Sequence, residues 1–106
     1  MTFQGIKDMI AGFGLPFAYY QFPDETGQQP PFICFWYDYR DFYADNSNYK
    51  KRVTVNIELY TDDKDIDLET GIEQSIPFSY GKESVYIDDE KMWQTTYSME
   101  VLIDGE

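Results

Sequence analysis

The chain has 106 residues, a length that suits one domain, and its 20 acidic and 8 basic side chains give a net charge of −12. Residues 53–106 carry most of this imbalance, with 14 acidic and 3 basic side chains. Nucleic-acid binding ordinarily requires lysine and arginine to neutralise phosphates, so this composition argues against a protein that binds nucleic acid through its phosphates. The acidity fits either a solvated surface or a surface that repels or imitates DNA.

The first predicted element is a short amphipathic helix over residues 2–13. Thr2 can cap its N-terminus, and Gly14 and Pro16 end it. The aromatic, β-prone segment 17–22 then predicts a first strand. The apolar stripe of the helix recurs at spacings of three and four and consists of Phe3, Ile6, Ile10 and Phe13.

A loop over residues 23–31 contains three prolines and separates two segments that are suited to pair as strands. Residues 32–40 form the second predicted strand, and their nearly continuous apolar run is typical of a strand that is covered on both faces or central in its sheet. Cys34, the only cysteine, lies in this run, so we expect a buried structural thiol, no internal disulfide and a reducing compartment. The polar segment 41–52 breaks the pattern and ends in a basic triplet.

Strict alternation of apolar and polar residues predicts the third strand over residues 53–60. After a polar turn, Asp65 can cap a second helix, and Pro77 stops it. Gly71 weakens this helix by roughly 1 kcal/mol relative to alanine, so the helix needs support from the sheet. The apolar side of the helix carries Leu68, Ile72 and Ile76.

Two further strands are predicted over residues 83–87 and 92–103, the second with the longest alternation in the chain. Short connections make antiparallel pairing dominant. The expected fold is α+β, a single domain over residues 1–106 with a mainly antiparallel sheet of about five strands and two helices on one face, in the order α-β-β-β-α-β-β. One face of the last strand carries Trp93, Thr95, Tyr97, Met99, Val101 and Ile103.

The chain lacks the residues that most catalytic sites require. It has no histidine, which removes the commonest general base and metal ligand, and it has no phosphate-binding glycine loop. Residues 63, 65 and 67 are aspartates at calcium-loop spacing, but Leu68 and Gln74 occupy the glycine and glutamate positions. A glycosidase-like carboxylate pair stays open, because any two acids can meet in space. We expect no enzyme activity, no metal and no cofactor.

A run of aromatic residues follows the second strand into polar sequence. We expect Phe35 and Trp36 to pack in the core, whereas the tyrosines beyond them lie either in ordinary packing or at a subunit interface. Nearby polar loops suit docking to a partner. The candidate interface residues are Tyr37, Tyr39, Phe42, Tyr43, Asp45, Asn46, Tyr49, Lys50, Lys51 and Arg52.

Four stretches of the chain resemble small virion proteins encoded by phages and prophages of Gram-positive bacteria. They are Leu15–Pro23, Phe42–Asn46, Val55–Thr61 and Ser98–Ile103. In size and element order the chain is similar to the tail terminator, or tail completion, proteins of long-tailed phages, and this resemblance extends over nearly its whole length.

The resemblance implies a virion protein that is made in the bacterial cytoplasm and acts at the head–tail junction. Its partners would be further copies of itself in a hexameric ring, the tail tube protein, and a head completion or connector protein, with no membrane. DNA would pass through the ring without specific binding, which an acidic lumen favours. The loops 23–31 and 41–52 would then be docking arms. Two alternatives stay open: another head–tail connector subunit, and an acidic inhibitor that imitates DNA.

Overall fold

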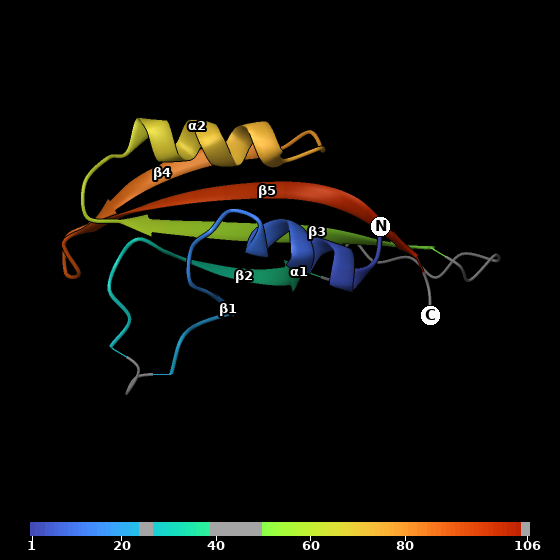
Figure 1. Cartoon of the computed structure of the whole chain (residues 1–106), viewed down its shortest axis with the longest axis horizontal. Helices are drawn as coiled ribbons and strands as arrows, with labels where there is room; N and C mark the ends of the chain where they lie inside the picture. Colours follow the sequence, from blue (N-terminus) through green and yellow to red (C-terminus); the bar gives the residue numbers. More distant parts are fainter. Residues whose placement is uncertain (24–26, 39–49, 105–106) are drawn as a thin grey trace.

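The computed structural model describes residues 1–23, 27–38 and 50–104, and for Lys50 and Lys51 the backbone alone. The predicted element order and the α+β class are confirmed (Figure 1). The elements are α1 (Phe3–Ala11), β1 (Phe17–Tyr19), β2 (Phe32–Asp38), β3 (Lys50–Thr61), α2 (Ile66–Ser75), β4 (Gly81–Ile87) and β5 (Met92–Asp104).

The five strands form one mixed sheet in the order β1-β2-β3-β5-β4. The long β3–β5 ladder is antiparallel and runs from Lys50 opposite Asp104 to Thr61 opposite Trp93. The pairs β2–β3 and β4–β5 are antiparallel as well. The sheet therefore has its two longest strands side by side, with a short strand at one edge.

The two segments predicted to pair do pair, but β1 runs parallel to β2, and this pair is the exception in an otherwise antiparallel sheet. The strand ends at Tyr19, and Tyr20 takes a left-handed φ of 70°, which turns the chain out of the predicted 17–22 strand. The connection over residues 20–31 is long enough for the crossover that parallel pairing requires. It returns the chain to the end of the sheet at which β1 began.

Both helices cover the same face of the sheet (Figure 1). Because strand side chains alternate, the odd-numbered residues of β2, β3 and β5 point toward the helices. Ile6 and Ile10 of α1 and Ile72 of α2 lie between helices and sheet, each at most 2% exposed. The strand residues of this core are Ile33, Phe35, Val53, Val55, Ile57, Leu59, Tyr97, Met99, Val101 and Ile103.

Each helix begins at the cap that the sequence predicts. The Gly5 amide donates to Thr2 Oγ1 at 2.9 Å, and the Leu68 amide donates to Asp65 Oδ1 at 3.1 Å. These bonds satisfy amides at the helix N-termini that have no partner within the helix. Both helix starts are thus set by local sequence.

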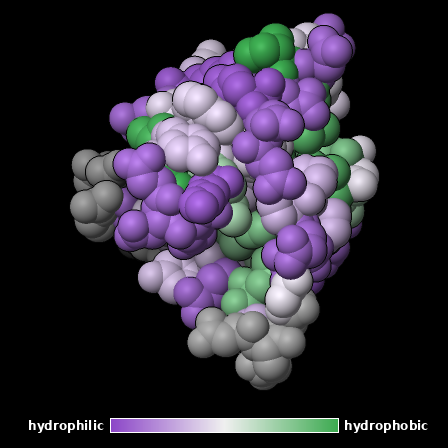
Figure 2. Space-filling model, turned by 90° about the vertical axis from the view of Figure 1, so that its left-hand side faces the viewer, coloured by the Kyte–Doolittle hydropathy of each residue, from purple (hydrophilic) through white to green (hydrophobic). Residues whose placement is uncertain are grey.

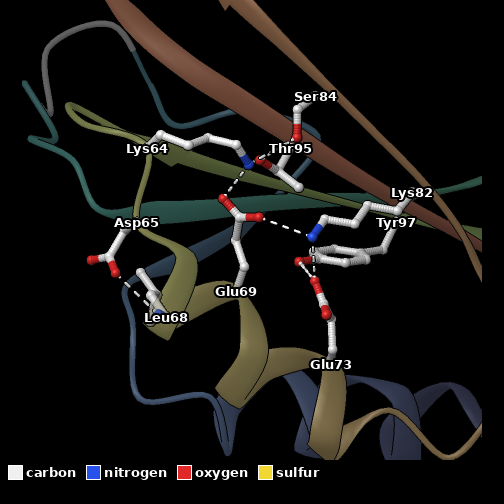
Figure 3. A network of polar contacts seen from close by, with 9 residues as sticks. All are labelled: Lys64, Asp65, Leu68, Glu69, Glu73, Lys82, Ser84, Thr95 and Tyr97. Carbon is white, nitrogen blue, oxygen red and sulfur yellow. Dashed lines mark hydrogen bonds and ion pairs between the residues drawn. The ribbon is translucent and has the colours of Figure 1, made fainter.

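A buried ionic cluster joins α2 to the sheet, and the sequence pattern gave no sign of it (Figure 3). Glu69 is 1% exposed, and its carboxylate pairs with Lys64, which precedes α2, and with Lys82 of β4, whose Nζ lies 3.0 Å from Oε1. Lys82 Nζ also lies 2.6 Å from Glu73 Oε2, which accepts a hydrogen bond of 2.8 Å from the Tyr97 hydroxyl. Two lysines thereby compensate a carboxylate that is almost fully removed from water.

Candidate functional site

The structure describes only part of the predicted interface. Tyr37 is half-buried on the helix side of β2, where its ring packs 4.8 Å from that of Phe3. Arg52 is exposed on β3, with NH1 3.8 Å from Glu100 Oε1, and the backbones of Lys50 and Lys51 belong to the same strand. The other predicted residues lie outside the described part of the chain: Tyr39, Phe42, Tyr43, Asp45, Asn46 and Tyr49. The interface hypothesis for this segment stays a prediction.

A groove lies on the face of the sheet opposite the helices. Here the even-numbered side chains of β2, β3 and β5 point away from the core. Trp36 belongs to this set and is half-buried, so the expectation that it packs in the core is wrong. The physical reason is the two-residue period: Phe35 enters the core, and its neighbour must point the other way.

A groove of about 780 Å³ lies on this face, between the sheet and the segment that follows β1. Its size falls in the range of ligand-binding clefts. One side is formed by residues 20–23, 27 and 28, and the floor by side chains of three adjacent strands. The floor and far side consist of Phe32, Cys34, Trp36, Glu58, Tyr60, Glu90 and Gln94.

Aromatic rings cross the groove in a row. The Phe22 ring meets the Phe32 ring edge-on at 5.4 Å, and Phe32 stacks on Tyr60 at 4.8 Å with 21° between the planes. The Tyr60 hydroxyl accepts a hydrogen bond of 2.8 Å from Gln94 Nε2, which continues the row to β5. These contacts hold the segment after β1 against the sheet and leave ring surface facing the groove.

Glu58 provides a half-buried carboxylate in the floor of the groove. Its Oε2 accepts from Trp36 Nε1 at 3.3 Å, and its Oε1 accepts from the Tyr60 hydroxyl at 3.0 Å. Both bonds orient the carboxylate, but neither neutralises its charge. No lysine or arginine of the described residues lines the groove or pairs with Glu58.

Cys34 lies in the floor of the groove and is 4% exposed, which confirms the expected burial of the thiol. Burial and the nearby Glu58 charge raise the pKa of the Cys34 thiol to about 11. The same two causes raise the pKa of the Tyr60 hydroxyl well above its ordinary value. Both groups are therefore neutral at physiological pH, and Cys34 lacks the thiolate character of a nucleophile.

A second hollow, of about 420 Å³, lies on the helix side between α1 and the strands β1 and β2. Rings of Phe3, Tyr19 and Tyr37 line it, and the Tyr37 amide donates to the Tyr19 hydroxyl at 3.1 Å. The Tyr19 hydroxyl thus satisfies a backbone amide of β2 that lies just beyond the residues paired with β1. This hollow contains one predicted interface residue, Tyr37.

The strand β4 forms the other edge of the sheet. It is seven residues long, and the described part of the chain places no strand on its outer side. Val85 and Tyr86 are exposed large apolar residues on this strand, at 43% and 45%. An edge of this kind presents backbone donors and acceptors to a further strand.

Within residues 1–23, 27–38 and 50–104, no group of three or more acidic or cysteine side chains is placed to hold a metal ion. No helix in the same residues has the length and apolar character needed to cross a membrane. Figure 2 shows the end of the molecule at which β3 runs into α2 as mainly hydrophilic, with hydrophobic residues in smaller patches. At this end of the molecule the surface is thus mainly polar, with apolar groups gathered locally.

No protein-family model and no curated protein matches this chain. The likeness to phage tail terminators therefore stays a prediction from the four stretches named above.

The sequence indicated a run of aromatic residues at and beyond the second strand, but it predicted neither the groove nor the role of Glu58. The alternation of β3 places Glu58 and Tyr60 on the polar face, and the register sets Glu58 opposite Cys34 of β2. The sequence held a signal of this, because β2 carries the rings of Phe32 and Trp36 at positions that pair with the polar face of β3. The contribution of residues 20–23, 27 and 28 depends on the parallel placement of β1, which the sequence did not indicate.

Proposed function

We propose that this chain is a structural subunit that acts by assembling with other proteins, and that its assembly is the tail terminator ring of a long-tailed phage. The observation that carries the assembly role is the one-sided coverage of the sheet. Both helices lie on one face, while the other face exposes an aromatic groove and the β4 edge lacks a neighbouring strand in the described structure. Open faces and edges of this kind are surfaces that protein partners cover.

The β4 edge supports a head-to-tail contact between copies. A surface that meets a different surface on the next copy generates a ring when the rotation closes. The described sheet ends at β4 on one side and at the three-residue β1 on the other, so its two edges differ. A contact between β4 of one copy and a different surface of the next copy is therefore of the head-to-tail type that can close into a ring.

The tail terminator assignment rests on the family resemblance, and the charge of the chain supports it. A net charge of −12 disfavours tight binding of DNA, which must pass through a ring at the head–tail junction. The same reasoning fits another connector subunit of the head–tail junction. A gene that lies beside the gene of the major tail protein supports the tail terminator, and a gene beside that of the portal protein supports the connector subunit.

The test is electron microscopy of the purified chain mixed with the tail tube protein encoded near it, together with light scattering after size exclusion. We expect rings at tube ends and tubes of limited length. A chain that stays monomeric and leaves tube ends bare and tube growth unchanged overturns the proposal.

A pair of matched variants tests the β4 edge. Val85→Lys adds a charge to the exposed edge and should abolish ring formation, because edge charges prevent strand pairing. Ile66→Lys makes the same change at an exposed residue of α2 and should leave rings intact. Equal ring formation by both variants contradicts a role for the β4 edge.

A further inference from the structure

The groove on the helix-free face combines two properties that together define a ligand chemistry. Its floor holds the Glu58 carboxylate, which is oriented by Trp36 and Tyr60 and has no cation beside it in the described structure. Its walls are aromatic, with Tyr20, Phe22 and Phe32 around the same space. A half-buried carboxylate costs free energy unless a cation compensates it.

Aromatic faces and a carboxylate favour the same kind of ligand. The ring quadrupole attracts cations, and tryptophan and tyrosine do so most strongly. Cys34 and Tyr60 are protonated at neutral pH, so Glu58 and Glu90 are the charged groups of the described lining. These charges disfavour an anionic ligand, and a purely apolar ligand leaves the Glu58 charge without a partner.

The structure elsewhere shows how this chain treats a buried carboxylate. Glu69, under α2, receives two lysines from its own chain. Glu58 receives hydrogen bonds from two neutral donors and, among the described residues, no ion pair. The described part of the chain therefore supplies cations to Glu69 and none to Glu58, so the Glu58 carboxylate can pair with a cation of a ligand.

We propose that the groove binds an arginine side chain presented by a segment of a partner protein, with the guanidinium paired to Glu58 and stacked on the Trp36 and Tyr60 rings. Arginine suits the site better than lysine, because its planar, weakly hydrated head stacks on rings and forms paired hydrogen bonds with a carboxylate. The groove of about 780 Å³ is larger than one side chain and is open, so it also has room for the residues beside the arginine. This proposal deepens the assembly function and rests on it for the claim that the partner is a protein.

The test uses nuclear magnetic resonance and the indole N–H signal of Trp36, which reports directly on the bond to Glu58. A Trp93→Phe variant identifies which of the two indole signals belongs to Trp36. The probe is a capped Gly-Arg-Gly peptide, and its controls contain citrulline, the neutral isostere of arginine, or lysine. We expect saturable movement of the Trp36 signal with arginine, weaker movement with lysine, and none with citrulline.

Two variants separate the site from the general acidity of the chain. Glu58→Gln removes the charge and keeps one acceptor oxygen, which can receive the Trp36 indole, while its amide nitrogen can donate to the Tyr60 oxygen. It should weaken binding of the arginine peptide about tenfold or more. Glu100→Gln removes the same charge from an exposed residue of the same face outside the groove, and affinity should stay within about twofold.

Equal binding of citrulline and arginine, an unchanged affinity in Glu58→Gln, or no movement of the Trp36 signal overturns the proposal. The peptide comparison uses the wild-type chain, so it stands even where Glu58→Gln fails to fold. The outcome is also independent of ring formation. If the chain binds arginine but never caps tail tubes, the tail terminator proposal fails and the groove proposal stands. If it caps tubes without binding arginine, the groove proposal fails and the tail terminator proposal stands.

Discussion

The ionic cluster under α2 gives a stability prediction with a defined sign (Figure 3). Replacing both Lys64 and Lys82 with methionine keeps most of the side-chain volume but leaves the buried Glu69 carboxylate without a cation. Breaking a buried pair from one side costs about 3–5 kcal/mol, because the remaining charge is uncompensated. The lysine side chains are 31% and 36% exposed, so solvent already screens them, and we expect a loss of about 3 kcal/mol at pH 7.

The dependence on pH follows from the pKa of Glu69. Burial alone raises this pKa, but the two lysines more than offset burial, so the pKa lies below its ordinary value of 4.5. In the wild type, Glu69 therefore contributes stability that is present above pH 4.5 and is lost as the pH falls through the lowered pKa. In the double variant only burial acts on Glu69, so its pKa is raised. Protonation of Glu69 at low pH then removes the free-energy cost of the buried charge. The difference in stability between the two proteins should shrink from pH 7 to pH 4.

Urea unfolding followed by tryptophan fluorescence measures these free energies. The control is Lys7→Gln with Arg52→Gln, which removes two exposed positive charges and should cost less than about 1 kcal/mol. Adding Glu69→Met to the double variant should recover most of the loss, because an apolar replacement of a buried ion pair is often neutral. Two results refute the reasoning. One is a double variant as stable as the control, and the other is a difference in unfolding free energy between wild type and double variant that does not change with pH.

Three smaller changes test other parts of the structure. Tyr97→Phe removes the hydroxyl that donates to Glu73 at 2.8 Å and should cost about 1–2 kcal/mol in urea unfolding; a value within error of zero contradicts the bond. Gly71→Ala should raise stability by about 0.5–1 kcal/mol, because a methyl group there meets no atom within 4 Å and alanine favours the helix; a lower melting temperature opposes this. The raised pKa of Cys34, about 11, keeps the thiol protonated, so native protein at pH 8 should react with a disulfide reagent far more slowly than urea-unfolded protein, and equal rates would show an accessible thiolate.

Much of the fold could be predicted because its signals are local. The two-residue period of β3 and β5 placed Ile57 and Tyr97 on the same buried face, and both are 0% exposed. The cap residues Thr2 and Asp65 marked the helix starts correctly. Strand ends were less accurate, because β1 ends where the backbone of Tyr20 turns, and aromatic content gives no sign of that turn.

The site was harder to predict than the fold. A glutamate in a polar strand position looks the same in sequence whether it faces water or a groove. Glu58 acquires its role from Trp36 on β2, which lies 22 residues away, and from the segment that follows β1. Glu69 likewise depends on Lys82 of β4. Such pairings arise only when distant segments meet.

The sequence by itself determined the α+β class, the order of the elements, the burial of Cys34 and the absence of histidine chemistry, because composition and short periods specify them. Only the tertiary structure decided that β1 runs parallel to β2, that Trp36 faces away from the core, and that Glu58 and Glu69 differ in their charge partners. The physical reason is that strand pairing and the burial of charge depend on contacts between residues far apart in the chain, which a local pattern does not encode.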